Sequence, residues 1–243
     1  MKIEKVTKLN NGYQIKLKDQ RLITVDEDTL VKERLLAGKE IDDVLLKELL
    51  MISNSYDCYL RAIKYNNYRL RSIKEMREYL IKLGCLEVEY LIGKLTLDGY
   101  LNDGIYQRAF INDRINLTLD GPLKIKRDLQ KRGIEMLEND EIFNQSGDDF
   151  WQERCQLIIN KQLRNVKPMS NFMLRKKLYD YLNQAGYQPE VINLALDEMN
   201  IDEASSLSNF INKNKAKYSE DKLIKKAIQA GFNYYEIINF LKG

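Results

Sequence analysis

The sequence contains no histidine, and it has only three prolines and three cysteines among its 243 residues. Without histidine the chain lacks the commonest general base and metal ligand, which excludes Ser–His and Cys–His nucleophile pairs and most zinc sites. The cysteines, Cys58, Cys85 and Cys155, form no CxxC pair. We expect each to be a buried, small hydrophobic residue in a reducing compartment, rather than part of a disulfide framework.

Long apolar runs are also missing. No run approaches the roughly 18 residues that a membrane span needs, and the N-terminal segment MKIEKVTKLNNG has no signal-peptide core. We therefore expect a cytoplasmic protein with no membrane partner. The 44% hydrophobic and 31% charged residues are typical of a folded, soluble chain. Because the net charge is only +3, any nucleic-acid surface must come from local clustering of cations.

The N-terminal part of the chain has the period of β-strands. The segments MKIEKVTKL, YQIKLKD and RLITV alternate apolar and polar residues, and Asn11-Gly12 is a hairpin turn signal between the first two. This pattern predicts three short antiparallel strands up to about Val25. It is followed by DEDTLVKERLLAGKEI, which predicts a helix that ends near Gly38, and by a second helix over DDVLLKELLMISNSYDCYLRAIKY.

From about residue 55 the pattern becomes helical and repeats at intervals of about 50 residues. Four segments each contain a helix that ends at a glycine, namely Gly84, Gly133, Gly186 and Gly231. Apolar residues stand eight and four positions before each glycine and form one stripe on the helix. We therefore predict a mostly α-helical protein of tandem three-helix repeats, forming an elongated curved array, with a small N-terminal strand module. The expected divisions are 1–50 for the strand module with a helix, and 55–101, 102–147, 148–201 and 202–243 for four repeats.

Acidic and amide residues recur between the repeats. Asn102-Asp103 lies within DGYLNDGIYQRAFINDRI, and the pairs Asp148-Asp149 and Asp202-Glu203 occupy similar positions later in the chain. We interpret Asn102 or Asp103 as the cap of the helix that follows, because free N–H groups at a helix start favour an oxygen and negative charge. A structural polar contact is one alternative, and a magnesium site is another. The magnesium site would need carboxylates that converge from different segments, which the sequence does not show.

The helical part resembles the RecX family, regulators of the bacterial RecA recombinase. The resemblance is carried by Arg69, Arg71 and Ser72 with Glu75, Met76 and Leu80, by Gly99-Tyr100-Leu101-Asn102-Asp103 with Tyr106 and Phe110, and by Gly121-Pro122, Ile125, Asp128-Leu129 and Lys131-Arg132-Gly133-Ile134. The resemblance rests on specific residues over roughly residues 55–135. In the remainder of the chain it rests only on the helical repeat architecture. Asn102, Met76 and Asp128 replace the family's usual aspartate, leucine and glutamate, and these replacements are conservative for capping or packing.

The resemblance implies a modular helical protein with no enzymatic activity and no cofactor. It would bind the RecA–DNA filament, touching RecA and single- and double-stranded DNA without strong sequence preference, and inhibit ATP hydrolysis and strand exchange. Two other classes stay open from the residues alone. Glycine-hinged helix pairs also resemble the helix-turn-helix of a sequence-specific DNA-binding protein. A carboxylate-dependent metal enzyme is disfavoured by the missing histidine and by the capping interpretation of the acids.

Basic residues gather in three segments of this weakly charged chain. We predict a partner or DNA surface from Arg69, Arg71, Lys74, Arg77, Lys124, Lys126, Arg127, Lys131, Arg132, Arg175, Lys176 and Lys177. Lys124, Arg127 and Lys131 lie at i, i+3 and i+7, on a helix face away from the apolar stripe. On the helix itself we expect only Asp128 to be close enough to pair with this face. The alternative is that these residues form solvated helix faces without a partner. The sequence does not predict which repeat contacts RecA and which contacts DNA.

Overall fold

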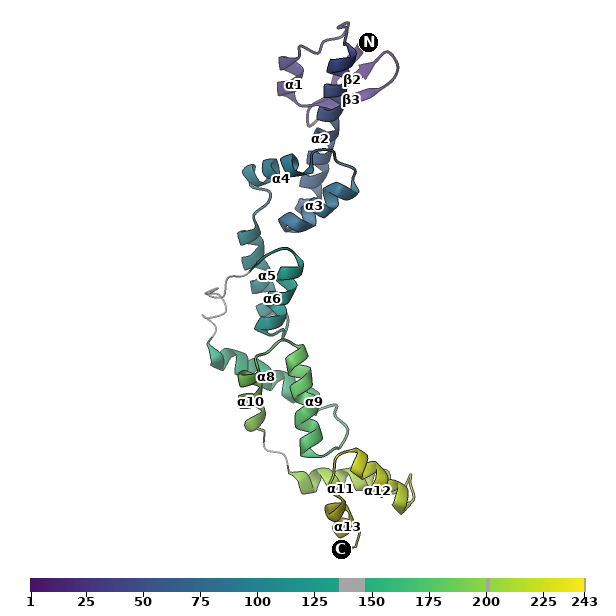
Figure 1. Ribbon diagram of the computed structural model, residues 1–243, viewed down its shortest axis with the longest axis vertical. Helices are drawn as coiled ribbons and strands as arrows, with labels where there is room; N and C mark the ends of the chain where they lie inside the picture. The colour runs from purple at the N-terminus through teal and green to yellow at the C-terminus, as the bar shows by residue number, and fades with distance from the viewer. Residues whose placement is uncertain (136–146, 200–201, 243) are drawn as a thin grey trace. The chain divides into compact units, whose positions relative to one another are not determined.

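The protein is mostly helical, with one small sheet at the N-terminal end of the chain (Figure 1). Its structure is a computed structural model that describes residues 1–135, 147–199 and 202–242. The predicted fold class, helices with an N-terminal strand module, is thereby confirmed. Among the described residues, no helix has both the length and the apolar character to cross a membrane.

The sheet consists of three antiparallel strands in sequence order, as predicted. These are β1 (Ile3–Lys8), β2 (Tyr13–Leu17) and β3 (Leu22–Val25). Alternate side chains point to one face, where Ile15 and Ile23 are fully buried, because successive residues of a strand face opposite sides. Leu35, Ile41 and Leu49 complete this core from the segments that follow the sheet.

Two helices follow the sheet, and the first is shorter than the sequence pattern predicts. α1 (Glu27–Lys32) ends well before Gly38, because Arg34 adopts a left-handed backbone with φ of 47° and turns Leu35 into the core. α2 (Asp43–Tyr68) is a single continuous helix. Its first half contributes Leu49 to the sheet core, and its second half contributes Ala62 to the next core. The expected division between residues 50 and 55 therefore runs through a continuous helix.

The remaining described helices follow one another along the chain. Their bounds are α3 (Ile73–Lys82), α4 (Val88–Leu97), α5 (Asp103–Leu117), α6 (Pro122–Lys131), α8 (Asp148–Leu163), α9 (Asn171–Gln184), α10 (Pro189–Asp197), α11 (Glu203–Asn214), α12 (Glu220–Gln229) and α13 (Tyr234–Lys242). The helix expected after the second repeat glycine falls mainly on residues 136–146, which lie outside the described residues. The chain divides into two compact units, residues 1–109 with 132–134, and residues 110–131 with 135–243.

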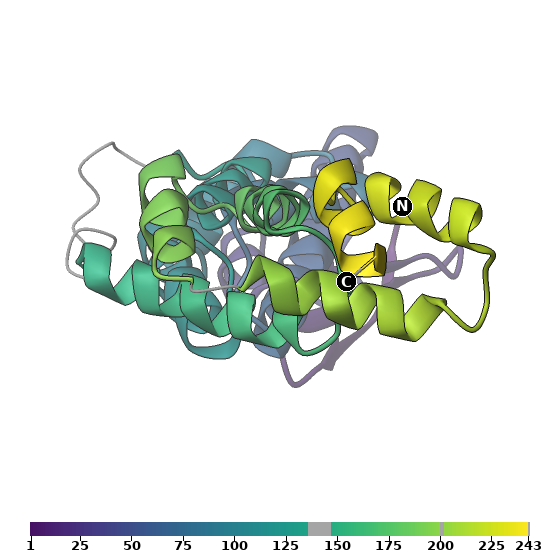
Figure 2. The same ribbon diagram turned by 90° about the horizontal axis from the view of Figure 1, so that it is seen from below.

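Each unit is built around apolar stripes on its helices. In the first unit, α2, α3 and α4 bury Met76, Leu80 and Leu95 in one cluster. In the second unit, α11 and α12 lie side by side (Figure 2) and bury a cluster with Leu223 and Ala227 at its centre. Met76 and Leu80, like Leu223 and Ala227, lie eight and four residues before a repeat glycine, so their burial confirms the predicted apolar stripe.

Two of the repeat glycines pack closely against the start of an earlier helix in the second unit. Gly186 has a φ of +90°, and a Cβ atom there would lie 2.3 Å from the backbone nitrogen of Lys124 at the start of α6. Gly231, also at +90°, lies in the same way against Ser170 and Met173 at the start of α9. Only glycine adopts this backbone without strain and also leaves room for such an approach. Each of these two glycines therefore docks on the start of the glycine-ended helix of the preceding repeat.

Candidate partner-binding surfaces

The arginines next to α3 have partners inside the first unit. Arg69 donates to Glu75 at 2.9 Å, and this bond raises the pKa of the guanidinium. Burial raises the pKa of the Glu75 carboxyl, but hydrogen bonds from Arg69 and the Ser72 backbone outweigh it, and the pKa falls below its ordinary value. The Arg71 guanidinium lies 3.8 Å from the centre of the Tyr65 ring. Both arginines therefore stabilise the entry to α3.

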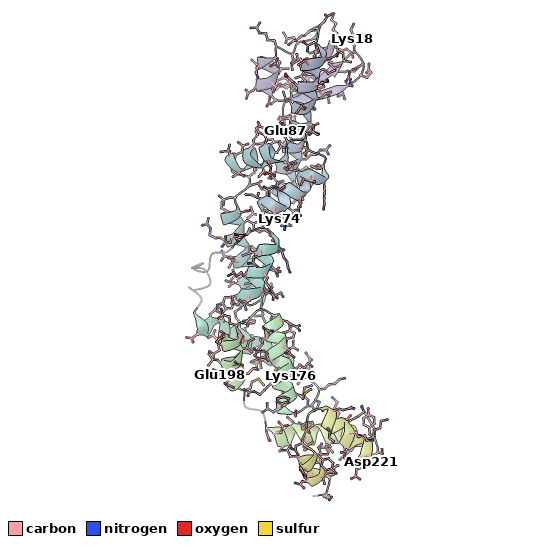
Figure 3. The ribbon with its side chains drawn as sticks, viewed as in Figure 1. Lys18, Lys74, Glu87, Lys176, Glu198 and Asp221 are labelled. Atoms are coloured by element: carbon pink, nitrogen blue, oxygen red, sulfur yellow. A yellow bond between two sulfur atoms is a disulfide. The ribbon has the colours of Figure 1, made fainter. Side chains whose placement is uncertain are left out.

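The other two predicted residues of this segment lie along α3 itself. Arg77 pairs with Glu89 of α4 at 2.6 Å, so its charge joins the two helices. Lys74 is exposed on α3 (Figure 3), and its aliphatic stem packs beside Gly133. The basic segment from residue 69 to residue 77 thus has structural contacts that its sequence pattern did not predict.

On α6 the predicted basic face belongs to an ion-pair network. Lys124 pairs with Asp120 at 2.6 Å, and Lys131 pairs with Asp128 at 3.3 Å. Arg114 of α5 contacts both carboxylates, at 2.9 Å and 3.3 Å. Asp128 is an acid on the helix that pairs with this face, as expected. Asp120, which precedes α6 and lies one helical turn before Lys124, pairs with the face as well. Part of the charge on this face is therefore compensated.

The remaining predicted residues differ in exposure and pairing. Arg175 of α9 pairs with Asp197 of α10. Arg127 is exposed and Lys126 is half-buried, while Lys176 (Figure 3) and its neighbour Lys177 are exposed. Within the part of the chain that the structure describes, these last four side chains form no ion pair. They are the predicted cations whose charge is most available to a partner.

Arg132, another residue of the predicted set, contacts the start of α3 through its backbone. Its carbonyl accepts a hydrogen bond from the Ser72 hydroxyl at 2.8 Å, which ties the turn after α6 to the start of α3. Its side chain is half-buried. This residue therefore has a packing role within the first unit, and its predicted part in binding is untested.

A hollow of about 740 Å³ in the second unit contains cations that the sequence analysis missed. It lies between the α5–α6 connection, α8 and α9, and its walls carry Lys124, Arg154 and Lys161 with a single carboxylate, Asp120. Arg154 lies over the Trp151 ring and donates to a backbone carbonyl, while its buried Nε has no hydrogen-bond partner among the described residues. The spacing of Arg154 and Lys161 at i and i+7 on α8 was the available signal, because it places both on one helix face.

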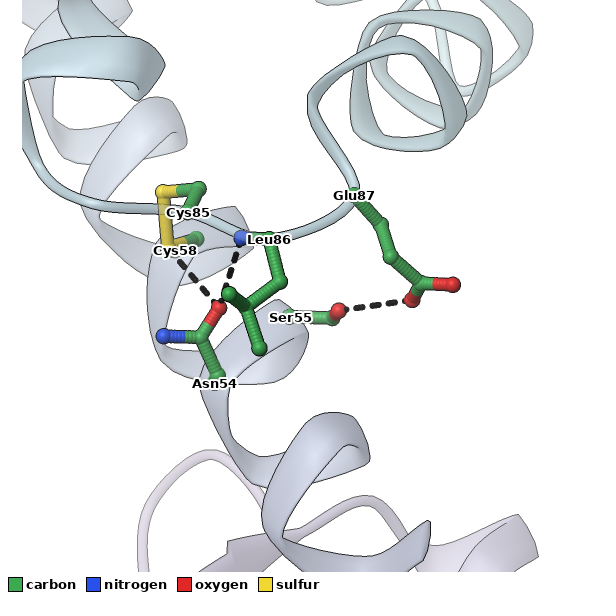
Figure 4. The surroundings of a disulfide bond; sticks show 6 residues. All are labelled: Asn54, Ser55, Cys58, Cys85, Leu86 and Glu87. Carbon is green, nitrogen blue, oxygen red and sulfur yellow. Dashed lines mark hydrogen bonds between the residues drawn. A yellow bond between two sulfur atoms is a disulfide. The ribbon is translucent and has the colours of Figure 1, made fainter.

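Cysteine pairing is a second feature that the sequence analysis missed. Cys58 of α2 and Cys85, just after α3, form a disulfide with a Cα–Cα distance of 6.1 Å (Figure 4). Both are buried, as expected, but the expectation of no disulfide is wrong. The pairing was hidden because the two residues are 27 positions apart and meet only when α3 packs on α2. Cys155 is a buried free thiol whose pKa burial raises to about 12, which makes it a poor nucleophile.

The acids and amides at the first repeat junction act as helix caps. Asn102 accepts a hydrogen bond from the Ile105 N–H at 3.0 Å and caps its own helix, as predicted. Asp103 instead accepts the N–H of Ile73, the first residue of α3, at 2.8 Å. A carboxylate near that helix start is also favoured by the helix dipole. Asp103 therefore links two helices, which sequence proximity alone did not suggest.

The same link recurs in the second unit. Glu203 accepts the N–H of Asn171, the first residue of α9, at 2.7 Å, and Asp202 caps α11. α6 differs because Pro122 is its first residue and has no N–H to satisfy. α8 begins after Gly147 without a side-chain cap, so the pattern does not extend to that helix. Across the described ranges, no three His, Cys, Asp or Glu side chains are grouped to hold a metal ion.

Curated relatives support the resemblance found in the sequence. A protein named Regulatory protein RecX from Bacillus cytotoxicus is 28% identical over 233 residues, which cover 90% of this chain and 86% of that protein. A protein of the same name from Bacillus cereus (strain B4264) is 29% identical over 178 residues, covering 72% of this chain and 66% of that protein. No family model matches the chain.

Two solved structures have a similar fold. One is the crystal structure of a regulatory protein RecX, with a TM-score of 0.69 and 24% identity over 81% of this chain and 99% of that one. The other is RecX from Lactobacillus salivarius, with a TM-score of 0.52 and 24% identity over 60% of this chain and 96% of that one. The predicted resemblance in sequence and the expected helical fold are both confirmed.

Proposed function

Because this chain is homologous to the regulatory proteins named RecX over most of its length, we propose that it regulates the RecA recombinase. It binds the RecA–DNA filament and inhibits ATP hydrolysis and strand exchange without catalysis or a cofactor of its own. The observation that carries this proposal is the 28% identity that extends over 90% of the chain. Identity of this extent covers both compact units rather than one shared module.

The charges of the second unit support a binding role. Arg127 on α6 and Lys176 and Lys177 on α9 are exposed cations that form no ion pair among the described residues. Such residues keep their full charge for phosphate groups or for an acidic protein surface. The ion-paired residues Arg69 and Arg77 are less suited to this role, because a partner would have to displace their carboxylates. We therefore place the strongest filament contacts on α6 and α9.

The test is co-sedimentation with RecA filaments assembled on single-stranded DNA, together with RecA ATP hydrolysis at equal protein concentration and salt. The variant R127E/K176E/K177E reverses three exposed charges that form no ion pair among the described residues, so the fold should be preserved. We expect it to bind the filament at least tenfold more weakly and to relieve inhibition. RecA-free DNA is the control substrate.

A matched control variant tests whether the position of the reversed charges matters or only the change in net charge. K5E/K18E/K47E reverses the same number of charges at exposed positions of the N-terminal module. It should inhibit ATP hydrolysis as the parent does. Equal loss of inhibition in both variants would mean that only total charge matters, and unchanged inhibition in the α6 and α9 variant would reject this surface.

A sequence-specific helix-turn-helix protein is the alternative function. Such a protein concentrates base contacts on one recognition helix, whereas the predicted basic residues here are distributed over α3, α6, α9 and the residues next to α3 and α6. Binding to DNA duplexes of random and selected sequence discriminates the two. A sequence reader should favour its site by about 10³-fold or more, and a filament regulator should bind all sequences alike.

A further inference from the structure

A second hollow, lined by lysines, lies in the C-terminal part of the second unit. It has a volume of about 370 Å³ and lies between α11, α12 and the connection from α8 to α9. Figure 2 shows α11 and α12 side by side, with their connecting loop at one end. The charged residues that line the hollow are Lys167, Lys213, Lys217 and Lys226, and no carboxylate lines the hollow. We call it the lysine hollow.

Among the described residues, none of these four lysines has an acidic partner. None of them forms an ion pair within residues 1–135, 147–199 and 202–242, whereas Lys124 of α6 pairs with a carboxylate at 2.6 Å. The C-terminus of α11 favours one nearby cation, which accounts for Lys213. It does not account for Lys167 and Lys226, which come from other segments. The fold thus brings four like charges around one hollow, an arrangement that a bound anion would stabilise.

One of the cations is held in place by an aromatic ring. The Lys226 ammonium lies 5.0 Å from the centre of the Tyr218 ring, a distance at which a cation is attracted to the ring face. Tyr218 and Phe210 also provide the flat apolar part of the lining. The hollow therefore combines ordered positive charge with aromatic walls.

The type of cation indicates the chemistry of the ligand. No arginine lines the hollow, although the arginine fork is the group best suited to planar, two-point binding of carboxylates. The lysine ammonium acts as a point charge, and it can donate hydrogen bonds to a phosphate that approaches from many directions. The volume lies in the range of small-ligand sites, and it suits more than one phosphate group. Cationic grooves with aromatic side chains are typical of proteins that bind single strands without sequence preference.

We propose that the lysine hollow binds the phosphodiester groups of a single-stranded nucleic acid. The proposal rests on the proposed function only in that the recombinase filament would supply such a strand. It assigns the contact to the last repeat, where the sequence analysis predicted no site residue. It also requires no recombinase, because free strands carry the same phosphates.

The test measures binding of a fluorescent oligothymidylate to the full-length protein over a range of salt concentrations, without recombinase. K213E/K217E/K226E should bind at least tenfold more weakly than the parent. The plot of log K against log[salt] should also become less steep by about 2, since each single-strand phosphate contact contributes about 0.7 to the slope. The milder variant K213Q/K217Q/K226Q should show the same direction of change, and thermal unfolding of each variant shows that it is folded.

The matched control is K215E/K225E/K242E, which reverses three lysines of the same region that do not line the hollow. It should keep both the affinity and the salt dependence of the parent. Equal weakening in the two charge-reversed variants, or no weakening in the hollow variant, would overturn the proposal.

Two further measurements distinguish the proposed strand-binding site from a free-nucleotide site and from a site that binds recombinase protein. Inorganic phosphate and thymidine monophosphate are added as competitors, and we expect displacement of the strand only at millimolar concentrations. Displacement at micromolar concentration would identify a free-nucleotide site instead.

Co-sedimentation with RecA filaments is then measured with the same variants. Weaker filament binding with unchanged free-strand binding would assign the hollow to recombinase protein, and unchanged results in both assays would reject the hollow while the proposed regulation stands.

Discussion

The first and last three-helix groups share a plan but use their polar residues differently. The group formed by the second half of α2, with α3 and α4, is braced by a disulfide, by the Arg69–Glu75 pair and by the Arg77–Glu89 pair. The group of α11, α12 and α13 has a comparable apolar cluster, and among its described residues it has no ion pair or disulfide. A basic residue in the sequence is therefore not the same as an available charge. Pairing, which depends on packing, decides whether it braces the fold or meets a partner.

Removing the disulfide should give the largest difference between the two groups. Cys58→Ser with Cys85→Ser should lower the free energy of unfolding by about 3 kcal/mol, because the bond closes a loop between residues 27 positions apart. Urea unfolding of the parent with and without dithiothreitol checks this, and the double variant should not respond to dithiothreitol. Hydrogen exchange in α12 should be unaffected by reduction. A parent that is equally stable under both conditions would show that the disulfide braces nothing.

Replacing two repeat glycines by alanine should distinguish the stability that is lost through backbone strain from the stability that is lost through steric overlap. Gly84 and Gly231 both have positive φ, but a Cβ at Gly84 meets nothing within 4 Å, while a Cβ at Gly231 would lie 2.3 Å from the Met173 side chain. Both variants pay about 1–2 kcal/mol for the left-handed backbone. Gly231→Ala should lose about 1–3 kcal/mol more through overpacking. Thermal unfolding of the two variants measures the difference, and equal losses would mean that the Gly231 joint is not tight.

The cap that Asp103 provides for α3 can be tested against an ordinary local cap. Asp103→Ala should cost about 1 kcal/mol and increase hydrogen exchange at the Ile73 amide, because that N–H loses its acceptor. Asp202→Ala should cost about the same but affect the start of its own helix, α11. Asp103→Asn keeps an acceptor oxygen and should restore most of the protection. Exchange that increases only within α5 would contradict the link between the two helices.

The smallest effect should come from neutralising one charge in each group. Glu75→Gln loses the ion pair with Arg69 and should cost about 0.5 kcal/mol at neutral pH. Lys217→Gln should change stability by less than about 0.5 kcal/mol in either direction, because this lysine forms no ion pair among the described residues. Urea unfolding at neutral pH measures both.

The effect of Glu75→Gln should also depend on pH in a fixed direction. The pKa of Glu75 in the folded protein lies below its ordinary value of 4.5, so its stabilisation is present above that value and is lost as pH falls through the lower folded pKa. The difference between parent and variant should therefore shrink as pH is lowered from 6 to about 3. A difference that stays constant over this range would show that the carboxylate charge contributes nothing.

The sequence alone determined the type of most described elements and several of their ends. Strand alternation up to Val25, the apolar stripes before the repeat glycines and the cap that Asn102 provides for its own helix are all found in the structure. These features are local, because the period of apolar residues and the needs of free N–H groups are set within a few neighbouring residues. Where a local signal was weak, as at the end of α1, the prediction was wrong by about one and a half turns of helix.

Only the tertiary structure decided which polar residues meet. The Cys58–Cys85 disulfide, the contact of Asp103 with α3 and the lysine hollow all join residues that are distant in the sequence. Sequence pattern gives each residue its place on an element, but it does not give the distance between side chains of different elements. That distance follows from how the apolar stripes pack, and ion pairing depends steeply on it. For this reason the helices could be predicted from the sequence, whereas the charges available to a partner could not.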